Sequence, residues 1–168
     1  MAENPQVADV YLDLRRGVLE LDPAKVGLSR ETGCREVWGL LMETGYPNAV
    51  VTLMAAADGT VSLYYSTGGG TLGLGELPGP RQAAEALLKA APEFAAACEP
   101  TTEYPLPGVG NTRFYLLTFD GVRTVEAKEE DFGYNRHPLS PLFHLAYQLL
   151  AEIQPVAEGL KDGAAEQD

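Results

Sequence analysis

Apolar and polar residues follow a regular pattern from Asn48 to Ser66, and this pattern predicts a β-hairpin. An almost unbroken apolar run covers Ala49 to Ala57, and apolar residues then occupy every second position from Val61 to Tyr65. Asp58-Gly59 stands between the two segments, and both residue types accept the positive φ angles of a type I′ turn. We therefore expect a central hairpin of an antiparallel sheet here.

A second stretch repeats this arrangement later in the chain. Thr112 to Phe119 predicts a strand, and Val122 to Ala127 predicts its alternating partner. Asp120-Gly121 separates the two segments and predicts another two-residue turn. Short edge strands are expected in addition at Thr71–Leu74 and Thr101–Tyr104.

Four segments carry the three- and four-residue spacing of apolar positions that is typical of amphipathic helices. They are Gln6–Leu21, Thr32–Thr44, Pro80–Ala91 and Pro141–Ile153. Gly45 stands where a left-handed residue would end the second helix. Pro92 predicts a kink or a new start after the third, and Pro155 predicts the end of the fourth.

Together these elements predict an α+β fold. It has a single antiparallel sheet built from two β-hairpin-plus-helix units, with helices packed on it and an extra N-terminal helix. We expect one domain over residues 1–154, because 168 residues suffice for one compact core. Residues 155–168 are polar and predict a disordered tail.

The order of these segments resembles that of roadblock and longin-type domains, which have profilin-like α/β/α folds. NAVVTLMAAADGTVSLYYS precedes PRQAAEALLKAA, and TRFYLLTFDGVRTVEA precedes SPLFHLAYQLLAEI. The matching order of helix, two strands, helix, strands and helix spans Thr32 to Ile153. Roadblock-like proteins act without catalysis, as homodimeric platforms for small GTPases and motor complexes. The resemblance therefore implies a self-associating, non-catalytic role.

Charge and composition exclude several partners. The formal net charge is −12 and the pI is about 4.5, so the surface repels nucleic acid and anionic membranes. No apolar run approaches the roughly 20 residues that span a bilayer, and the first residues lack a signal-peptide pattern, so we expect a cytoplasmic protein. Cys34 and Cys98 have no CxxC spacing and no neighbouring histidine, which predicts buried reduced thiols rather than a metal site.

The glycine-rich stretch after the first hairpin contains a GxGxxG pattern at Gly68, Gly70 and Gly73. This pattern binds dinucleotides when its glycines open a helix, so that the helix N-terminus faces the pyrophosphate. Here further glycines and Pro78 come before the helix, and the sheet is predicted to be antiparallel. A loop that needs glycine for close backbone approach is therefore the favoured interpretation.

The most chemically varied stretch runs from Tyr134 to His144 and contains both histidines of the chain. Ser140, His137 and an acid such as Asp131 are the residue types of a hydrolase triad. However, Ser140 before a proline at a helix start is explained by N-capping. The nearby carboxylates from Glu126 to Asp131 match no calcium-loop spacing and favour a solvated surface.

Two hypotheses of different class follow. The first is a non-catalytic interaction or scaffold module that binds a protein partner or a second copy of itself as a homodimer. The alternative is a small-molecule-binding protein or enzyme, with a pocket between the Gly68–Gly75 loop and the Tyr134–His144 segment. The candidate ligand-binding residues are Gly68, Gly69, Gly70, Tyr134, Arg136, His137 and His144. No catalytic residue, metal site or cofactor is predicted, and the residues favour a role other than catalysis.

Overall fold

The computed structural model describes residues 7–29 and 36–166, with the backbone alone from residue 154 onward. Over these residues, seven strands form one antiparallel sheet in the order β4-β3-β2-β1-β6-β7-β5. The strands are β1 Val37–Tyr46, β2 Ala49–Ala56, β3 Val61–Tyr65, β4 Gly70–Thr71, β5 Glu99–Thr101, β6 Asn111–Thr118 and β7 Gly121–Lys128. The predicted α+β class with a single antiparallel sheet is therefore confirmed.

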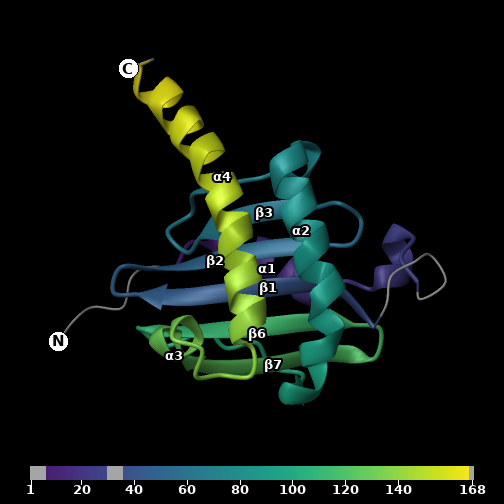
Figure 1. Ribbon diagram of the computed structural model, residues 1–168. Coiled ribbons are helices and arrows are strands. Elements are labelled where there is room, and N and C mark those ends of the chain that lie inside the picture. The colour runs from purple at the N-terminus through teal and green to yellow at the C-terminus, as the bar shows by residue number, and fades with distance from the viewer. Residues whose placement is uncertain (1–6, 30–35, 167–168) are drawn as a thin grey trace.

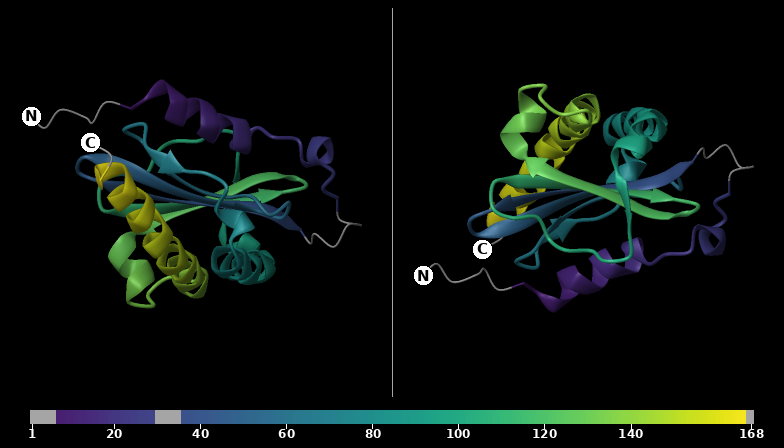
Figure 2. Two further views of the ribbon diagram at one scale, coloured as in Figure 1. Left: turned by 90° about the horizontal axis from the view of Figure 1, so that it is seen from above. Right: turned by 90° about the horizontal axis from the view of Figure 1, so that it is seen from below.

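Helices cover both faces of this sheet (Figures 1 and 2). The N-terminal helix α1 (Asp9–Leu19) lies on one face. The helices α2 (Pro78–Ala90), α3 (Glu129–Gly133) and α4 (Ser140–Glu166) lie on the other. Short 3₁₀ turns are η1 (Pro23–Val26), η3 (Leu74–Glu76) and η4 (Ala91–Ala97).

Each face of the sheet buries its own apolar cluster. The larger cluster lies under α2 and α4 and includes Leu40, Leu53, Leu87, Phe114 and Leu149. The smaller cluster lies under α1 and includes Tyr11, Trp38, Leu41, Met54 and Leu117. The sheet is thus buried on both sides along its central strands.

The helix predicted over Thr32–Thr44 is wrong for the part that the structure describes. Residues 36–44 lead into and form β1, the central strand of the sheet, while residues 30–35 lie outside the described residues. Leu40 points to one cluster and Leu41 to the other. A strand buried on both faces is apolar throughout and loses its alternation, so its sequence is easily mistaken for a helix. The element order that carries the likeness to roadblock domains is changed at this point.

Gly45 does not end a helix either, because it lies within β1. A Cβ atom on Gly45 would stand 2.3 Å from the carbonyl oxygen of Gly108. The neighbouring Val109 forms an isolated parallel bridge with Gly45. Glycine is therefore needed here because another backbone segment passes close to the strand.

Both Asp-Gly dipeptides reverse the chain as predicted, but the turn details differ. At the first, only Gly59 has a positive φ (+95°), and its N–H donates to the Ala56 carbonyl at 3.0 Å. The connection is a three-residue loop that ends in a left-handed glycine, so the predicted two-residue type I′ turn is wrong. At the second, Thr118 pairs with Gly121, which places Phe119 and Asp120 in the turn.

Other boundaries shift by a few residues. Helix α2 begins at Pro78 rather than Pro80. The chain then continues as the 3₁₀ turn η4, which contains Pro92, in line with a new start at this proline rather than a kink. Helix α3 forms inside a predicted loop. Helix α4 is helical as far as Glu166, so Pro155 does not end it. The assignment of residues 155–168 to a tail outside the domain stays a prediction.

Candidate functional site

The two halves of the predicted pocket lie in different parts of the sheet. Gly70 pairs with Tyr64 of β3, and the position of a Cβ on Gly68 lies 3.3 Å from Ala8, next to α1. The segment Tyr134–His144 follows α3 and leads into α4, on the opposite face of the sheet from α1. Four strand spacings separate β3 from β7, which corresponds to about 19 Å at roughly 4.8 Å per spacing. The structure therefore brings Tyr134, Arg136, His137 and His144 together, but not the glycines with them.

Ser140 and His137 take part in the turn that begins α4. The Ser140 hydroxyl accepts a hydrogen bond from the His137 N–H at 3.3 Å, and His137 Nδ1 accepts one from the Leu139 N–H at 3.0 Å. The His137 ring lies 4.4 Å from the ring of Phe132. Burial lowers the pKa of His137, although the charge of Asp131 opposes this shift. Ser140 is the first residue of α4, and its hydroxyl bonds to the turn before the helix rather than to a helix N–H, so the predicted N-cap role is wrong. The hydrogen bonds that both side chains make here are to backbone atoms and hold this turn.

A cluster of exposed apolar and aromatic side chains lies at the end of the sheet where β1 stops. We call it the tyrosine surface and define it as Tyr46, Val109, Tyr134 and Tyr147. Their side chains are 41%, 67%, 69% and 37% exposed. Exposed apolar residues that form one contiguous patch can mark a binding surface.

Backbone and side-chain contacts join three of these residues. The Gly110 N–H donates to the Gly45 carbonyl at 2.8 Å, which fixes the turn containing Val109 beside Tyr46. The Tyr147 hydroxyl donates to Glu129 Oε2 at 2.9 Å. Burial, the hydrogen bond to Glu129 and the proximity of Tyr46 raise the pKa of Tyr147, so its hydroxyl stays protonated as a donor.

Tyr134 joins the surface through the turn after α3. Asn135, next to it, has the left-handed φ of +62°. The Asn135 side-chain oxygen lies 2.9 Å from His144 Nε2. His144 lies about one helical turn before Tyr147 in α4. The guanidinium of Arg136 lies 5.2 Å from the centre of the Tyr134 ring. The site residues His144, Arg136 and Tyr134 thus border or form this surface.

A second polar cluster is buried beneath α1. Arg15 donates from Nε and Nη2 to the two carboxylate oxygens of Glu43, at 2.7 and 2.9 Å. Thr52 donates to the same carboxylate at 2.8 Å, and the Tyr11 hydroxyl lies 2.7 Å from Thr52 Oγ1. Burial opposes the charge on Arg15, but the hydrogen bond and charge of Glu43 outweigh it and raise the pKa of Arg15. This cluster is fully paired and attaches α1 to the sheet.

Sequence reasoning missed Arg15 and Glu43. The available signal was a glutamate directly after the apolar run VWGLLM. A carboxylate that follows such a run is expected to need a buried cation if the run is a central strand.

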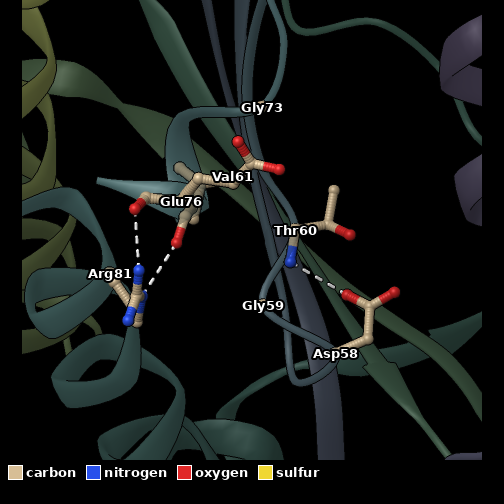
Figure 3. A pocket seen from close by; sticks show the side chains of 8 residues that line it. Asp58, Gly59, Thr60, Val61, Gly73, Glu76 and Arg81 are labelled. Atoms are coloured by element: carbon tan, nitrogen blue, oxygen red, sulfur yellow. Dashed lines mark hydrogen bonds between the residues drawn. The ribbon is translucent and has the colours of Figure 1, made fainter. Parts of the chain in front are cut away.

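An open groove of about 510 Å³ lies beside the first hairpin turn. It is lined by Asp58, Thr60, Glu76 and Arg81 together with glycines of the neighbouring loop (Figure 3). Arg81 donates to the carbonyls of Gly75 and Glu76 at 3.0 and 2.7 Å. These bonds fasten α2 to the 3₁₀ turn before it, so Arg81 has a structural role in this groove.

No group of three or more His, Cys, Asp or Glu side chains among the described residues is arranged to hold a metal ion. Burial raises the pKa of the Cys98 thiol to about 11 despite the nearby Arg123, and Cys34 lies outside the described residues. Within the described part of the chain, no helix is long and apolar enough to cross a membrane.

Comparisons with protein-family models, with curated proteins and with solved structures give no match. The protein is an α+β protein with one antiparallel sheet and helices on both faces.

Proposed function

We propose that this protein is a non-catalytic interaction module that self-associates as a homodimer through the tyrosine surface. The observation that carries the proposal is the exposure of Tyr46, Val109 and Tyr147 where β1 ends, together with that of Tyr134, the C-cap residue of the short helix whose first residue, Glu129, bonds Tyr147. In such a dimer, the other surfaces of each copy would stay open to a protein partner.

The chemistry of the surface favours a protein ligand. Tyrosine supplies a large rigid area with a polar tip and is enriched in protein interfaces. Tyr147 is already held by its hydrogen bond to Glu129. Because this side chain is ordered before binding, less conformational entropy is lost when a partner covers it.

Charge favours this surface for contact between two copies. A chain with a net charge of −12 repels its copy over most of its area. Near the tyrosine surface, however, Arg136 pairs with Asp131 at 3.6 Å, and Lys128 is followed in the sequence by Glu129 and Glu130, so the local charge is closer to balance than that of the whole chain. A two-fold interface uses the same patch on both copies, and mixed charges can then pair across it.

The test is the oligomeric state across micromolar concentrations, measured by sedimentation velocity. The wild-type chain is expected to dimerise as its concentration rises. The double variant Tyr134→Ser/Val109→Ser should dissociate about ten-fold more readily, because exposed interface residues of this size contribute of the order of 1–2 kcal/mol. Both side chains are more than half exposed, so folding should be preserved, as circular dichroism would check.

The matched control is Leu72→Ser, which alters a residue 60% exposed at the β4 edge of the sheet. Its dimerisation should equal that of the wild type. A monomer at every concentration, or a dimer that Leu72→Ser weakens and the double variant does not, would overturn the proposal.

A further inference from the structure

Helix α1 packs on the sheet with only part of its predicted apolar face: Val7, Tyr11, Val18 and Leu21 lie in or against the cluster under α1, whereas Val10 and Leu14 are exposed. The apolar spacing of the sequence places Val10 and Leu14 in the predicted buried face together with Tyr11. In the structure, the buried residues of the helix are Tyr11, Arg15 and Leu19, while Val10 and Leu14 are 53% and 37% exposed. Arg15 of this helix reaches Glu43, and within the described residues the apolar flank of Val10 and Leu14 stays largely uncovered.

Gly17 continues this flank. Val10, Leu14 and Gly17 are separated by four and three positions, the spacing of a seam between two helices. A glycine inside a helix lowers its stability relative to alanine. A Cβ on Gly17 would meet nothing within 4 Å, so no described part of the chain requires glycine there. A glycine on an exposed helix face permits the close approach of another backbone.

We propose that this flank of α1, defined by Val10, Leu14 and Gly17, docks an amphipathic helix of a basic partner protein. The exposed acid Asp13 stands one position before Leu14, along the edge of the seam, and the exposed Glu20 is the C-cap residue at the end of the helix. In paired helices, residues at such edge positions select the partner by charge. Lysine or arginine at the facing positions of the partner would complement them.

The same acids argue against other occupants. If two α1 helices paired through this flank, the acidic edge of each copy would come close to that of the other, which is repulsive. Helices that bind membrane surfaces carry Lys and Arg beside their apolar face, whereas this flank carries Asp and Glu. A basic protein helix is therefore the occupant that the charges favour.

Helix α1 is held firmly enough to serve as a docking element. The Arg15 to Glu43 pair anchors its middle, and the Ala8 N–H donates to the Ser66 carbonyl at 2.8 Å at its start. Figure 2 shows α1 on the face opposite α3 and α4, so this site is separate from the tyrosine surface. The two proposals can therefore fail independently.

The probe is a synthetic peptide of three heptads with Leu at the seam positions and Lys at the edge positions, labelled for fluorescence anisotropy. One control peptide has Glu in place of Lys, and another has the Lys peptide's composition in scrambled order. The Lys peptide is expected to bind the wild-type chain, and the Glu peptide and scrambled peptide at least ten-fold more weakly. The scrambled peptide matters because the negative chain attracts any cationic peptide.

Variants then locate the site. Val10→Gln/Leu14→Gln should weaken binding of the Lys peptide at least ten-fold without changing charge, and Leu72→Gln, another exposed apolar position, should leave it unchanged. Asp13→Lys/Glu20→Lys should shift the preference toward the Glu peptide. The proposal is overturned if the scrambled peptide binds equally well, or if Val10→Gln/Leu14→Gln has no effect. It is also overturned if the flank instead mediates self-association or binds phosphatidylcholine vesicles.

Discussion

Arg15 Nε lies 2.7 Å from Glu43 Oε2, and the two side chains are only 7% and 0% exposed. The pair joins the middle of α1 to β1, the central strand of the sheet. A buried ion pair adds little net stability compared with apolar residues, but each partner alone is a costly buried charge. The pair therefore determines how α1 is oriented on the sheet more than how stable the sheet is.

We expect Glu43→Ala to lower the free energy of unfolding by about 3–5 kcal/mol, because Arg15 would be left buried without its counter-ion. Urea denaturation followed by tryptophan fluorescence measures this, since Trp38 lies in the same cluster under α1. Glu85→Ala is the matched control, because Glu85 is exposed on α2. Equal losses in the two variants would contradict the role of the pair.

The hairpins were predictable from the sequence because their signals are local. The turn dipeptides and the alternation after Asp58 and around Asp120 act over a few residues, and the structure keeps both reversals. By contrast, β1 was hidden because both its faces are buried. Whether VWGLLM is a strand or a helix depends on β2 and β6 pairing on either side of it. That information is not local.

The candidate surfaces show the same difference between local sequence signals and long-range contacts. Tyr134 was identifiable as part of a polar, varied segment, but Tyr46 and Tyr147 were not. Their grouping depends on the end of β1 meeting α4, which the pattern of either segment alone does not reveal. The exposed flank of α1 was hidden for a related reason, since the orientation of the helix depends on Arg15 finding Glu43. Most of the predicted apolar residues of α1 are still packed on the sheet, and only Val10 and Leu14 depart from the pattern.

A pH-dependent contribution to stability is expected from Glu126. Burial would raise the pKa of this carboxyl, but hydrogen bonds from Asn111, Gly108 and Arg113 outweigh burial and lower it. A group with a depressed folded pKa stabilises the fold above its ordinary pKa and loses that effect as the pH falls through the folded value. The stabilisation is therefore present above about pH 4.5 and declines below it.

Glu126→Gln should accordingly flatten the acid side of the stability profile. Thermal unfolding between neutral and acidic pH would show a smaller loss of stability in the variant than in the wild type below this point. Glu93→Gln, an exposed site on η4, should leave the profile unchanged. A variant profile parallel to that of the wild type would show that Glu126 has the same pKa in both states.

Gly45 provides a test of the close backbone approach at the end of β1. The variant Gly45→Ala places a Cβ 2.3 Å from the Gly108 carbonyl oxygen, so the backbone near Val109 must move. We expect a loss of about 1–3 kcal/mol in unfolding free energy, the typical cost of overpacking. Hydrogen exchange should also become faster at the Gly110 amide, which donates to Gly45. An unchanged exchange rate would contradict the described contact.

Replacing Gly17 by alanine should raise the free energy of unfolding, in contrast to the same change at Gly45. Gly17→Ala adds a Cβ that meets nothing within 4 Å, and alanine is a better helix former by about 0.8–1 kcal/mol, so the free energy of unfolding should rise by up to that amount. If α1 docks a partner helix through its exposed flank, the same methyl group would push the partner's backbone away. The variant should then be more stable and bind the Lys peptide more weakly.

Gly133→Ala on α3 is a matched comparison, since a Cβ there also meets nothing within 4 Å, and it should leave peptide binding unchanged. Calorimetry and anisotropy measured on the same samples separate the two effects. A gain in stability with undiminished binding would show that the glycine does not serve the docking of a helix.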